Sequence, residues 1–282
     1  MMDPLLPHLM DILSSPDSRG LILAGGFGIR VKQSYLRDTN ARTLLTPFPE
    51  ARATLDLDFF LSLSLFVHKE RGAAVRQLLN QLGYTEYTPK YQFEKVMASD
   101  SLEQKVKVDL LARLPEGEDI QVKSLRVGAN SGIDLHGRVT PEGFAVEENP
   151  LQIPIRGYNS NGAMVEAPVL LPNPYAWLNL KVKAAHGWLR MDRGEIFQKP
   201  SREKHVFDVY VLIAMLTELE LQEAGSMAVR YEDKPVANEI RNCAHDLYAD
   251  RNSAAVDEIR RQASSTIEYE AFWQALSFAL GL

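Results

Sequence analysis

The sequence predicts an α/β (α+β) fold in which a mixed β-sheet with flanking helices is followed by a C-terminal helical bundle. The first observation is the order of patterns over residues 1–112, where strand, glycine turn, helix and strand follow one another. The second is the change at "LPNPYAWLNLKVKAAHGWLR", where two prolines precede a long helical pattern and further helical segments follow. We therefore expect a boundary near residue 170 and two domains, 1–170 and 171–282.

The periodicity of hydrophobic residues and the positions of glycines predict the first helices and strands of the sheet domain. Residues 4–14 have a helical pattern, and "LILAGG" at 21–26 predicts a short buried strand that ends in two glycines. Residues 54–61 are expected to form a strand, and 68–82 a helix closed by Gly83. This alternation predicts helices packed on a sheet.

The remaining elements complete the two domains. Strands are expected near 90–97 and at 104–112. From 114 to 173 the chain is rich in Gly, Pro and Asn, and short pieces such as "QVKSLRV" and "GAMVEAPVLL" predict edge strands, hairpins and loops. Beyond it, 174–190 predicts a long helix. Three or four more helical segments follow, including "KHVFDVYVLIAMLTEL", whose spacing is that of an amphipathic helix with an apolar interior.

Composition and charge favour a globular protein of the cytoplasm. The chain has 282 residues, and 31 Lys and Arg against 37 Asp and Glu give a net charge of −6, which predicts no general attraction to nucleic acid. The single cysteine, Cys243, cannot form an internal disulfide. The N-terminal "MMDPLLPHLMDILSS" lacks the pattern of an export signal, and no apolar run reaches the roughly 20 residues of a membrane span.

Two aspartates, Asp56 and Asp58, lie in the apolar strand pattern "RATLDLDFFLS". Because side chains alternate along a strand, both point to one face, about 6.6 Å apart along the strand axis. Two like charges so close are costly unless a cation or solvent compensates them. Mg²⁺ prefers oxygen ligands and commonly takes one or two carboxylates together with substrate phosphates. The alternative is a strand with one solvated face.

A third carboxylate, Asp109, lies on the polar face of the neighbouring strand pattern "QKVKVDLLARL". Three carboxylates on adjacent strands could hold two metal ions and support an in-line displacement at a phosphate. The alternative for Asp109 is a surface partner of the nearby lysines. Whether it would act as a metal ligand or as a general base stays open.

The glycine turn in "LAGGFGIRVKQ" predicts a phosphate site. Backbone amides at the start of a helix after Gly25 and Gly26 can face a phosphate, although an ordinary turn is the alternative. Arg52 and Thr54 precede the acidic strand at the same parity as its two aspartates, so they are expected on the same side. They could fix the carboxylates or contact a nucleotide, and a salt bridge that satisfies this face is the alternative.

Taken together, "LAGGFGIR…RATLDLDFFLS", "KVKVDLL" and "LNLKVKAA…REKHVFDVYVL" resemble the AbiEii/AbiGii-type nucleotidyltransferases, a group that includes many toxin components of toxin and antitoxin pairs. The resemblance covers roughly residues 20–215. It implies a nucleotidyltransferase-type sheet in which Gly25 and Gly26 seat the triphosphate and Asp56 and Asp58 bind Mg²⁺. Arg52 and Thr54 would support that strand. Lys181 would contact phosphate, with Lys183 as the alternative in register, and Lys204 and Asp208 match the lysine and the final aspartate of the last motif.

The expected function is that of a Mg²⁺-dependent nucleotidyltransferase, which transfers an NMP from an NTP to an acceptor hydroxyl. The resemblance implies a tRNA 3′ end or a protein as acceptor, and a cognate antitoxin as partner. Three departures bear on activity: Phe27 follows the glycine pair where many members have Ser or Thr, His205 replaces an aspartate, and "YLRDTNARTLLTPFP" suggests an inserted loop. The alternatives are a nucleotide-binding or interaction protein that lost turnover, and a nucleotidyltransferase acting on a drug or sugar.

Overall fold

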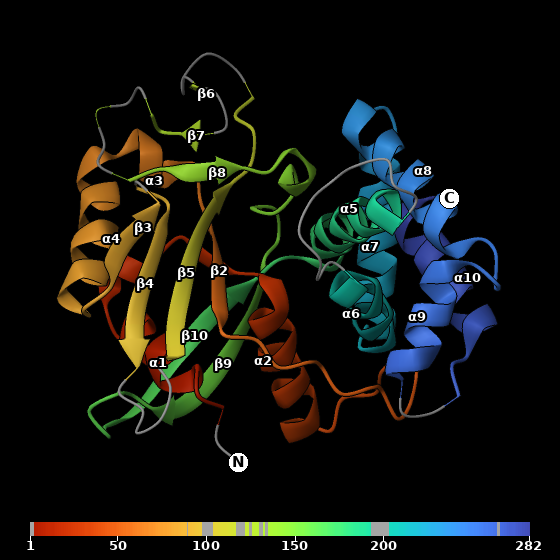
Figure 1. Cartoon of the computed structure of the whole chain (residues 1–282), viewed down its shortest axis with the longest axis horizontal. Coiled ribbons are helices and arrows are strands. Elements are labelled where there is room, and N and C mark those ends of the chain that lie inside the picture. The colour runs from red at the N-terminus through yellow and green to blue at the C-terminus, as the bar shows by residue number, and fades with distance from the viewer. Residues whose placement is uncertain are drawn as a thin grey trace. The chain divides into compact units, whose positions relative to one another are not determined.

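The computed structural model describes residues 3–88, 90–97, 104–116, 122–123, 126–129, 132, 135–192, 203–263 and 266–282. The chain divides into two compact units, the first comprising Met1–Tyr35 and Arg52–Pro172, the second Leu36–Ala51 and Asn173–Leu282. The fold class is the predicted one, a mixed sheet with flanking helices followed by C-terminal helices (Figure 1). Within the described residues, no helix has the length and apolar character needed to cross a membrane.

The first unit contains the sheet and the helices that flank it (Figure 1). Its helices are α1 (Leu6–Leu13), η1 (Pro16–Ser18), α2 (Gly25–Asp38, whose last turn belongs to the second unit), α3 (Ser64–Val67), α4 (Lys69–Gln81) and η2 (Pro141–Gly143). Its strands are β1 (Leu21–Leu23), β2 (Asp56–Leu61), β3 (Thr85–Thr88), β4 (Gln92–Met97), β5 (Gln104–Ala112), β6 (Val122–Lys123), β7 (Arg126–Val127), β8 (Gly137–Val139), β9 (Leu151–Tyr158) and β10 (Met164–Leu171).

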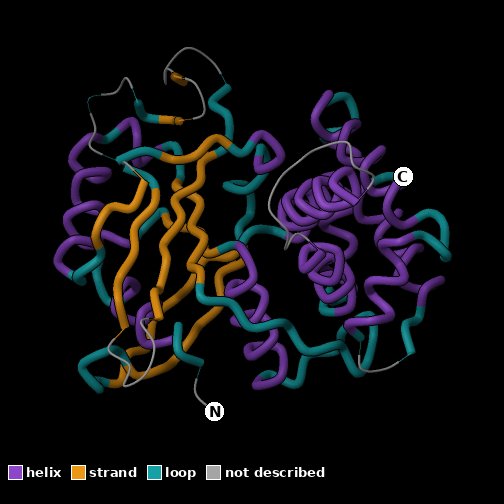
Figure 2. The backbone as a smooth tube through the Cα atoms, in the orientation of Figure 1, coloured by secondary structure: helices purple, strands orange, loops and turns teal. Residues whose placement is uncertain are grey.

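The strands, drawn in orange in Figure 2, form one mixed sheet. Its main path runs β6-β7-β8-β5-β2-β1-β10-β9, and β4, which pairs with β3, branches from β5. Strand β2 lies parallel to β5 and antiparallel to β1. On its other edge β5 pairs with β4 over most of its length and with β8 at its end. From Val106 to Leu110 the residues of β5 alternate between buried and less buried, as the period-two pattern predicts, and β2 carries Asp58 between the buried Leu57 and Phe59. The acidic strand is therefore an interior strand of the sheet.

Some element boundaries differ from those predicted, for local backbone reasons. The strand expected at 21–26 ends at Leu23, because Gly25, at φ +64°, already begins α2. The helix expected at 68–82 is preceded by a separate short helix, because His68 between them has an extended conformation. The strand expected near 90–97 starts at Gln92 and is paired with the additional strand β3.

The second unit is helical (Figure 1). Its helices are α5 (Pro174–Asp192), α6 (Glu203–Ala214), α7 (Glu218–Arg230), α8 (Pro235–Tyr248), α9 (Ala254–Gln262) and α10 (Tyr269–Leu280). Every residue from Val206 to Ala214 is buried, which makes α6 a core helix. The segment Leu36–Ala51 also belongs to this unit. It is held there in part by a hydrogen bond from the Leu44 amide to the Leu216 carbonyl, 2.8 Å long.

Side-chain caps define where two of these helices begin. Thr217 and Glu220 form a reciprocal capping box at the start of α7, and Ser253 accepts a hydrogen bond from the Val256 amide at the start of α9.

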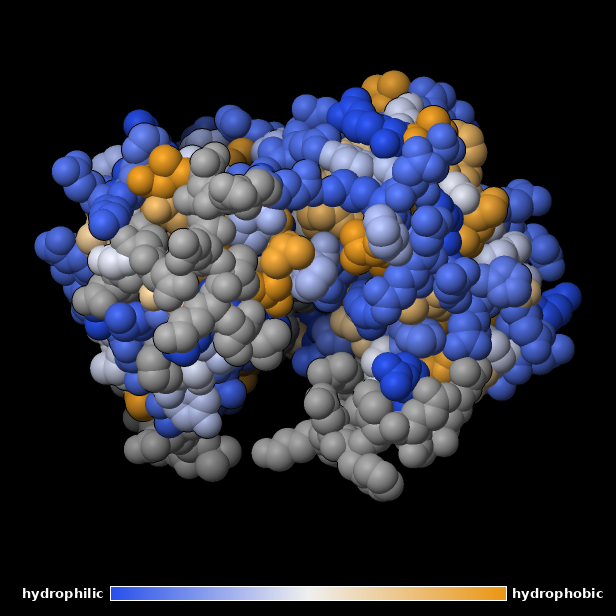
Figure 3. Space-filling model, turned by 90° about the horizontal axis from the view of Figure 1, so that it is seen from above, coloured by the Kyte–Doolittle hydropathy of each residue, from blue (hydrophilic) through white to orange (hydrophobic). Residues whose placement is uncertain are grey.

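The face of the molecule drawn in Figure 3 is mostly hydrophilic, with small groups of apolar residues between the polar ones. Such scattered exposed apolar residues are ordinary for a folded protein.

Candidate active site

The glycine turn lies directly against the acidic strand. The Ala24 amide donates a hydrogen bond to the Asp58 carbonyl at 2.8 Å, which continues the antiparallel pairing of β1 with β2. The next residue, Gly25, has φ +64°, and a methyl group on it would overlap Oδ2 of Asp58 and fall 2.7 Å from its Cγ. The Asp58 carboxylate therefore occupies the space that any larger residue at position 25 would need.

We expect Gly25→Ala to destabilise the fold by about 3 kcal/mol. Left-handed backbone costs alanine roughly 1–2 kcal/mol, and overpacking against the Asp58 carboxylate adds roughly 1–3 kcal/mol. The matched control is Gly162→Ala, since Gly162 also has a positive φ, +76°, but has nothing within 4 Å of an added methyl. Urea unfolding measures both variants, and equal losses in the two would contradict the close packing of Asp58 on the turn.

Arg52 and Thr54 lie beside the second glycine of the turn. A methyl group on Gly26 would fall 3.2 Å from Nη2 of Arg52 and 3.6 Å from Cβ of Thr54. The Thr54 hydroxyl accepts a hydrogen bond from the Asp56 amide at 3.3 Å, so it also fixes the start of β2. The structure thus places the two glycines, the arginine, the threonine and Asp58 in one cluster.

The third predicted carboxylate is the cross-strand neighbour of Asp58. In the parallel pairing of β2 with β5, Asp58 is opposite Asp109 and Asp56 is opposite Lys107. Residues opposite one another in neighbouring strands point to the same face, and the strands are about 4.8 Å apart. Both Asp58 and Asp109 are half-buried. The register therefore holds Asp58 and Asp109 side by side, with Asp58 against the glycine turn and Asp109 one strand further from it.

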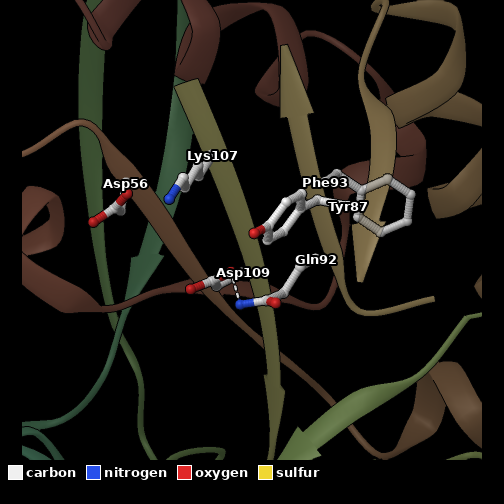
Figure 4. A pocket seen from close by; sticks show the side chains of 6 residues that line it. All are labelled: Asp56, Tyr87, Gln92, Phe93, Lys107 and Asp109. Carbon is white, nitrogen blue, oxygen red and sulfur yellow. Dashed lines mark hydrogen bonds between the residues drawn. The ribbon is translucent and has the colours of Figure 1, made fainter. Parts of the chain in front are cut away.

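Asp109 borders a cavity of about 120 Å³ on the side of β2 away from the glycine turn. Its lining residues, drawn in Figure 4, are Asp56, Tyr87, Gln92, Phe93, Lys107 and Asp109. Tyr87 is 66% exposed, and the Lys107 ammonium lies 6.0 Å from the centre of its ring. The cavity therefore combines carboxylates, a cation and an accessible aromatic face.

Burial raises the pKa of Asp109 above its usual value, and several neighbours oppose that shift. The hydrogen bond from the Gln92 amide, 2.9 Å long, is the largest of the opposing effects, followed by the charge of Arg138. The charge of Asp56 adds to the upward shift of the pKa. Sequence reasoning missed Gln92, because nothing in the sequence says which strand pairs with the other edge of β5.

The donor set fits Mg²⁺ as an ion shared with a substrate. Carboxylate oxygens are the ligands this ion prefers, and it usually takes one or two from the protein and the rest from phosphates and water. In the part of the chain that the structure describes, no group of three or more His, Cys, Asp or Glu side chains could hold an ion. The three predicted aspartates therefore do not form one metal-binding group, and the adjacent pair Asp58 and Asp109 fits the arrangement with one ion.

The other predicted site residues, Lys181, Lys204 and Asp208, belong to the second unit. Lys181 donates a hydrogen bond to Oδ2 of Asp208 at 2.6 Å, and the two side chains are 5% and 3% exposed. Asp208 therefore pairs with a lysine of another helix, α5, although Lys204 lies one turn before it on α6. Lys183, the alternative to Lys181, forms an ion pair with Glu239 at the surface.

His205 lies beside this buried ion pair. Its Nδ1 is 3.6 Å from Oδ2 of Asp208. Burial lowers the pKa of His205 to about 4 against the upward effect of the nearby Asp208 carboxylate, and the Lys181 charge adds a smaller downward contribution. The histidine is therefore neutral in the folded chain at pH 7.

This lowered pKa predicts a loss of stability in mild acid. The unfolded chain binds a proton at position 205 near pH 6.5 and the folded chain only near pH 4, so the free energy of unfolding falls as the pH drops between these values. From pH 7 to pH 5 the His205 contribution amounts to about 2 kcal/mol. Urea unfolding of His205→Gln at both pH values should show a loss smaller by that amount than in the parent chain. His68→Gln, at an exposed position, is the control, and an unchanged loss in His205→Gln would contradict the prediction.

Phe27, which follows the glycine pair in place of a Ser or Thr, is part of the core. Its side chain is 2% exposed in the first turns of α2, so it packs inward from the glycine turn.

Comparison of the chain with family models, with curated proteins and with solved structures finds no match in any of the three. The residues and their geometry are therefore what a functional proposal can use.

Proposed function

We propose that this chain is a Mg²⁺-dependent nucleotidyltransferase, which transfers an NMP from an NTP to an acceptor hydroxyl. The observation that carries the proposal is the position of Asp58, whose carboxylate touches the glycine turn on one side and is opposite Asp109 on the other. A triphosphate at the start of α2 would therefore lie within reach of two carboxylates that share an ion with it. The resemblance to the AbiEii/AbiGii-type nucleotidyltransferases supports the same reading.

Each group in the cluster has a role in this reaction. The amides after Gly25 and Gly26 bind phosphate oxygens, and the Arg52 guanidinium beside them offsets further negative charge. The acceptor oxygen forms a bond to the α-phosphorus while the bond to the β-phosphate oxygen breaks, and pyrophosphate leaves. The acceptor hydroxyl releases its proton to solvent as this bond forms, while Asp109 would hold the ion together with Asp58. The bound ion would supply charge neutralisation for the phosphates.

The cavity beside Asp109 is the entry side for the acceptor in this proposal. In-line displacement requires the nucleophile to approach opposite the leaving group. If pyrophosphate leaves at the glycine turn, the acceptor enters from the other side of Asp58, where the cavity lies. The resemblance points to a tRNA 3′ end or a protein as acceptor and to an antitoxin as partner. Composition and the single cysteine favour the cytoplasm as the location.

Labelled substrate tests the proposal. The purified chain is incubated with each α-³²P-labelled NTP, Mg²⁺, total tRNA and a cell extract, and label is followed into nucleic acid and into protein. We expect label in one class of acceptor, dependent on the divalent ion. Label in neither class, with every NTP tried, would contradict transferase activity toward these acceptors and would leave a drug or sugar as the acceptor to test.

A second candidate is a nucleotide-binding protein without turnover. The identity of Phe27 favours it, because a phenylalanine after the glycine pair offers no hydroxyl to a phosphate and packs into the core instead. Equilibrium dialysis with the labelled NTPs separates the two candidates. Binding that is weakened by Asp58→Asn, together with no transfer to any acceptor, supports the second.

A further inference from the structure

A row of polar side chains crosses four strands of the sheet and ends at the candidate site. Thr88 on β3 is opposite Gln92 on β4, and Gln92 is opposite Asp109 on β5. Asp109 is in turn opposite Asp58 on β2. Since opposed residues share a face, the row leads from an outer strand of the sheet to the carboxylate at the glycine turn.

Hydrogen bonds link the first three members of the row. Nε2 of Gln92 donates to Oδ1 of Asp109 at 2.9 Å, as the dashed line in Figure 4 marks. The Thr88 hydroxyl donates to Oε1 of the same amide. An amide has a donor end and an acceptor end, so the bond from Thr88 determines that the donor end faces the carboxylate. One Asp109 oxygen is held in this way, and Gln92 does not engage the other.

We propose that Gln92 is a positioning residue, which fixes the Asp109 carboxylate so that its second oxygen can bind the divalent ion shared with Asp58. Thr88 fixes Gln92 in turn. Partners that orient a metal-binding side chain commonly contribute tenfold or more to metal affinity or activity. The inference rests on the proposed function, because it assumes the ion between the two carboxylates.

The first test measures binding of Mn²⁺ alone to the full chain, from the electron paramagnetic resonance signal of free Mn²⁺. Gln92→Leu should weaken binding about tenfold, and Thr88→Val should weaken it less. Gln104→Leu is the matched control, since Gln104 is an exposed glutamine of β5 outside the cavity lining. Its affinity should equal that of the parent chain.

The second test uses the transfer reaction and separates kcat from KM. Since Gln92 does not touch the glycine turn, Gln92→Leu should lower kcat roughly tenfold and change the KM for the NTP by less than about twofold. A general loss of structure would change both. Thr88→Val decides the matter if Gln92→Leu does not fold.

The outcomes distinguish this inference from the proposed function. If the parent chain binds Mn²⁺ and transfers label, but the Gln92 and Thr88 variants match it in affinity and kcat, the positioning role is overturned and the proposed function stands. If the parent chain neither binds Mn²⁺ nor transfers label, both are overturned. Weaker Mn²⁺ binding in the two variants, with Gln104→Leu unchanged, supports the positioning role even before the acceptor is identified.

Discussion

Asp58→Asn is expected to lower nucleotidyl transfer at least about a thousandfold, which corresponds to roughly 4 kcal/mol of transition-state stabilisation. Asparagine keeps the shape of the side chain but removes the charge that would hold the ion beside the glycine turn. The same change should leave the fold intact, because the side chain still fills the space above Gly25. Label transfer per minute, measured against the parent chain, gives the effect, and urea unfolding checks the fold.

The control for this variant is Asp17→Asn, which removes an exposed aspartate of the same unit. Its transfer rate should match that of the parent chain. A loss of less than tenfold in Asp58→Asn would show that the carboxylate is not needed for the chemistry. In that case the cluster at the glycine turn would be a structural feature of the fold.

Breaking the buried Lys181–Asp208 pair has the largest effect on stability that we expect. Lys181→Met should lower the free energy of unfolding by about 3–5 kcal/mol, because it leaves the Asp208 carboxylate buried without its ammonium partner. Removing both charges with Lys181→Met and Asp208→Leu together should restore a large part of that loss. Urea unfolding of the single and double variants completes the cycle.

A surface pair on the same helix serves as the comparison. Lys183 lies two residues after Lys181, and its side chain and that of its partner Glu239 are 31% and 57% exposed. Lys183→Met should therefore cost less than about 1 kcal/mol. If Lys181→Met were as mild as Lys183→Met, the pair would not be a buried structural contact, and the implied phosphate role of Lys181 would gain support.

The sequence predicted the parts of the site that depend on period and order. Alternation along two strands placed Asp56, Asp58 and Asp109 on polar positions, and the strand-end glycines marked the start of α2. These signals are local, because successive side chains of a strand point to opposite faces wherever the strand lies in the sheet. The fold class followed from the same local patterns and their succession.

The missed features are those that depend on long-range contacts. Gln92 contacts Asp109 only because β4 pairs with β5 in a register that places the two residues opposite each other. The sequence alone does not show which strands pair or in which register. Lys181 meets Asp208 across 27 residues, between two helices whose facing sides are both apolar in pattern. Likewise, the stretch that looked like an inserted loop belongs to the second unit, since its hydrogen bonds reach the end of α6.

The most direct test of the account is a crystal structure of the chain with a non-hydrolysable NTP and Mn²⁺, read by anomalous scattering. We expect one Mn²⁺ peak at about 2.2 Å from oxygens of Asp58 and Asp109 and from the triphosphate. The phosphates should contact the amides after Gly25. A triphosphate bound away from the glycine turn, or a metal peak that neither aspartate touches, would contradict the account.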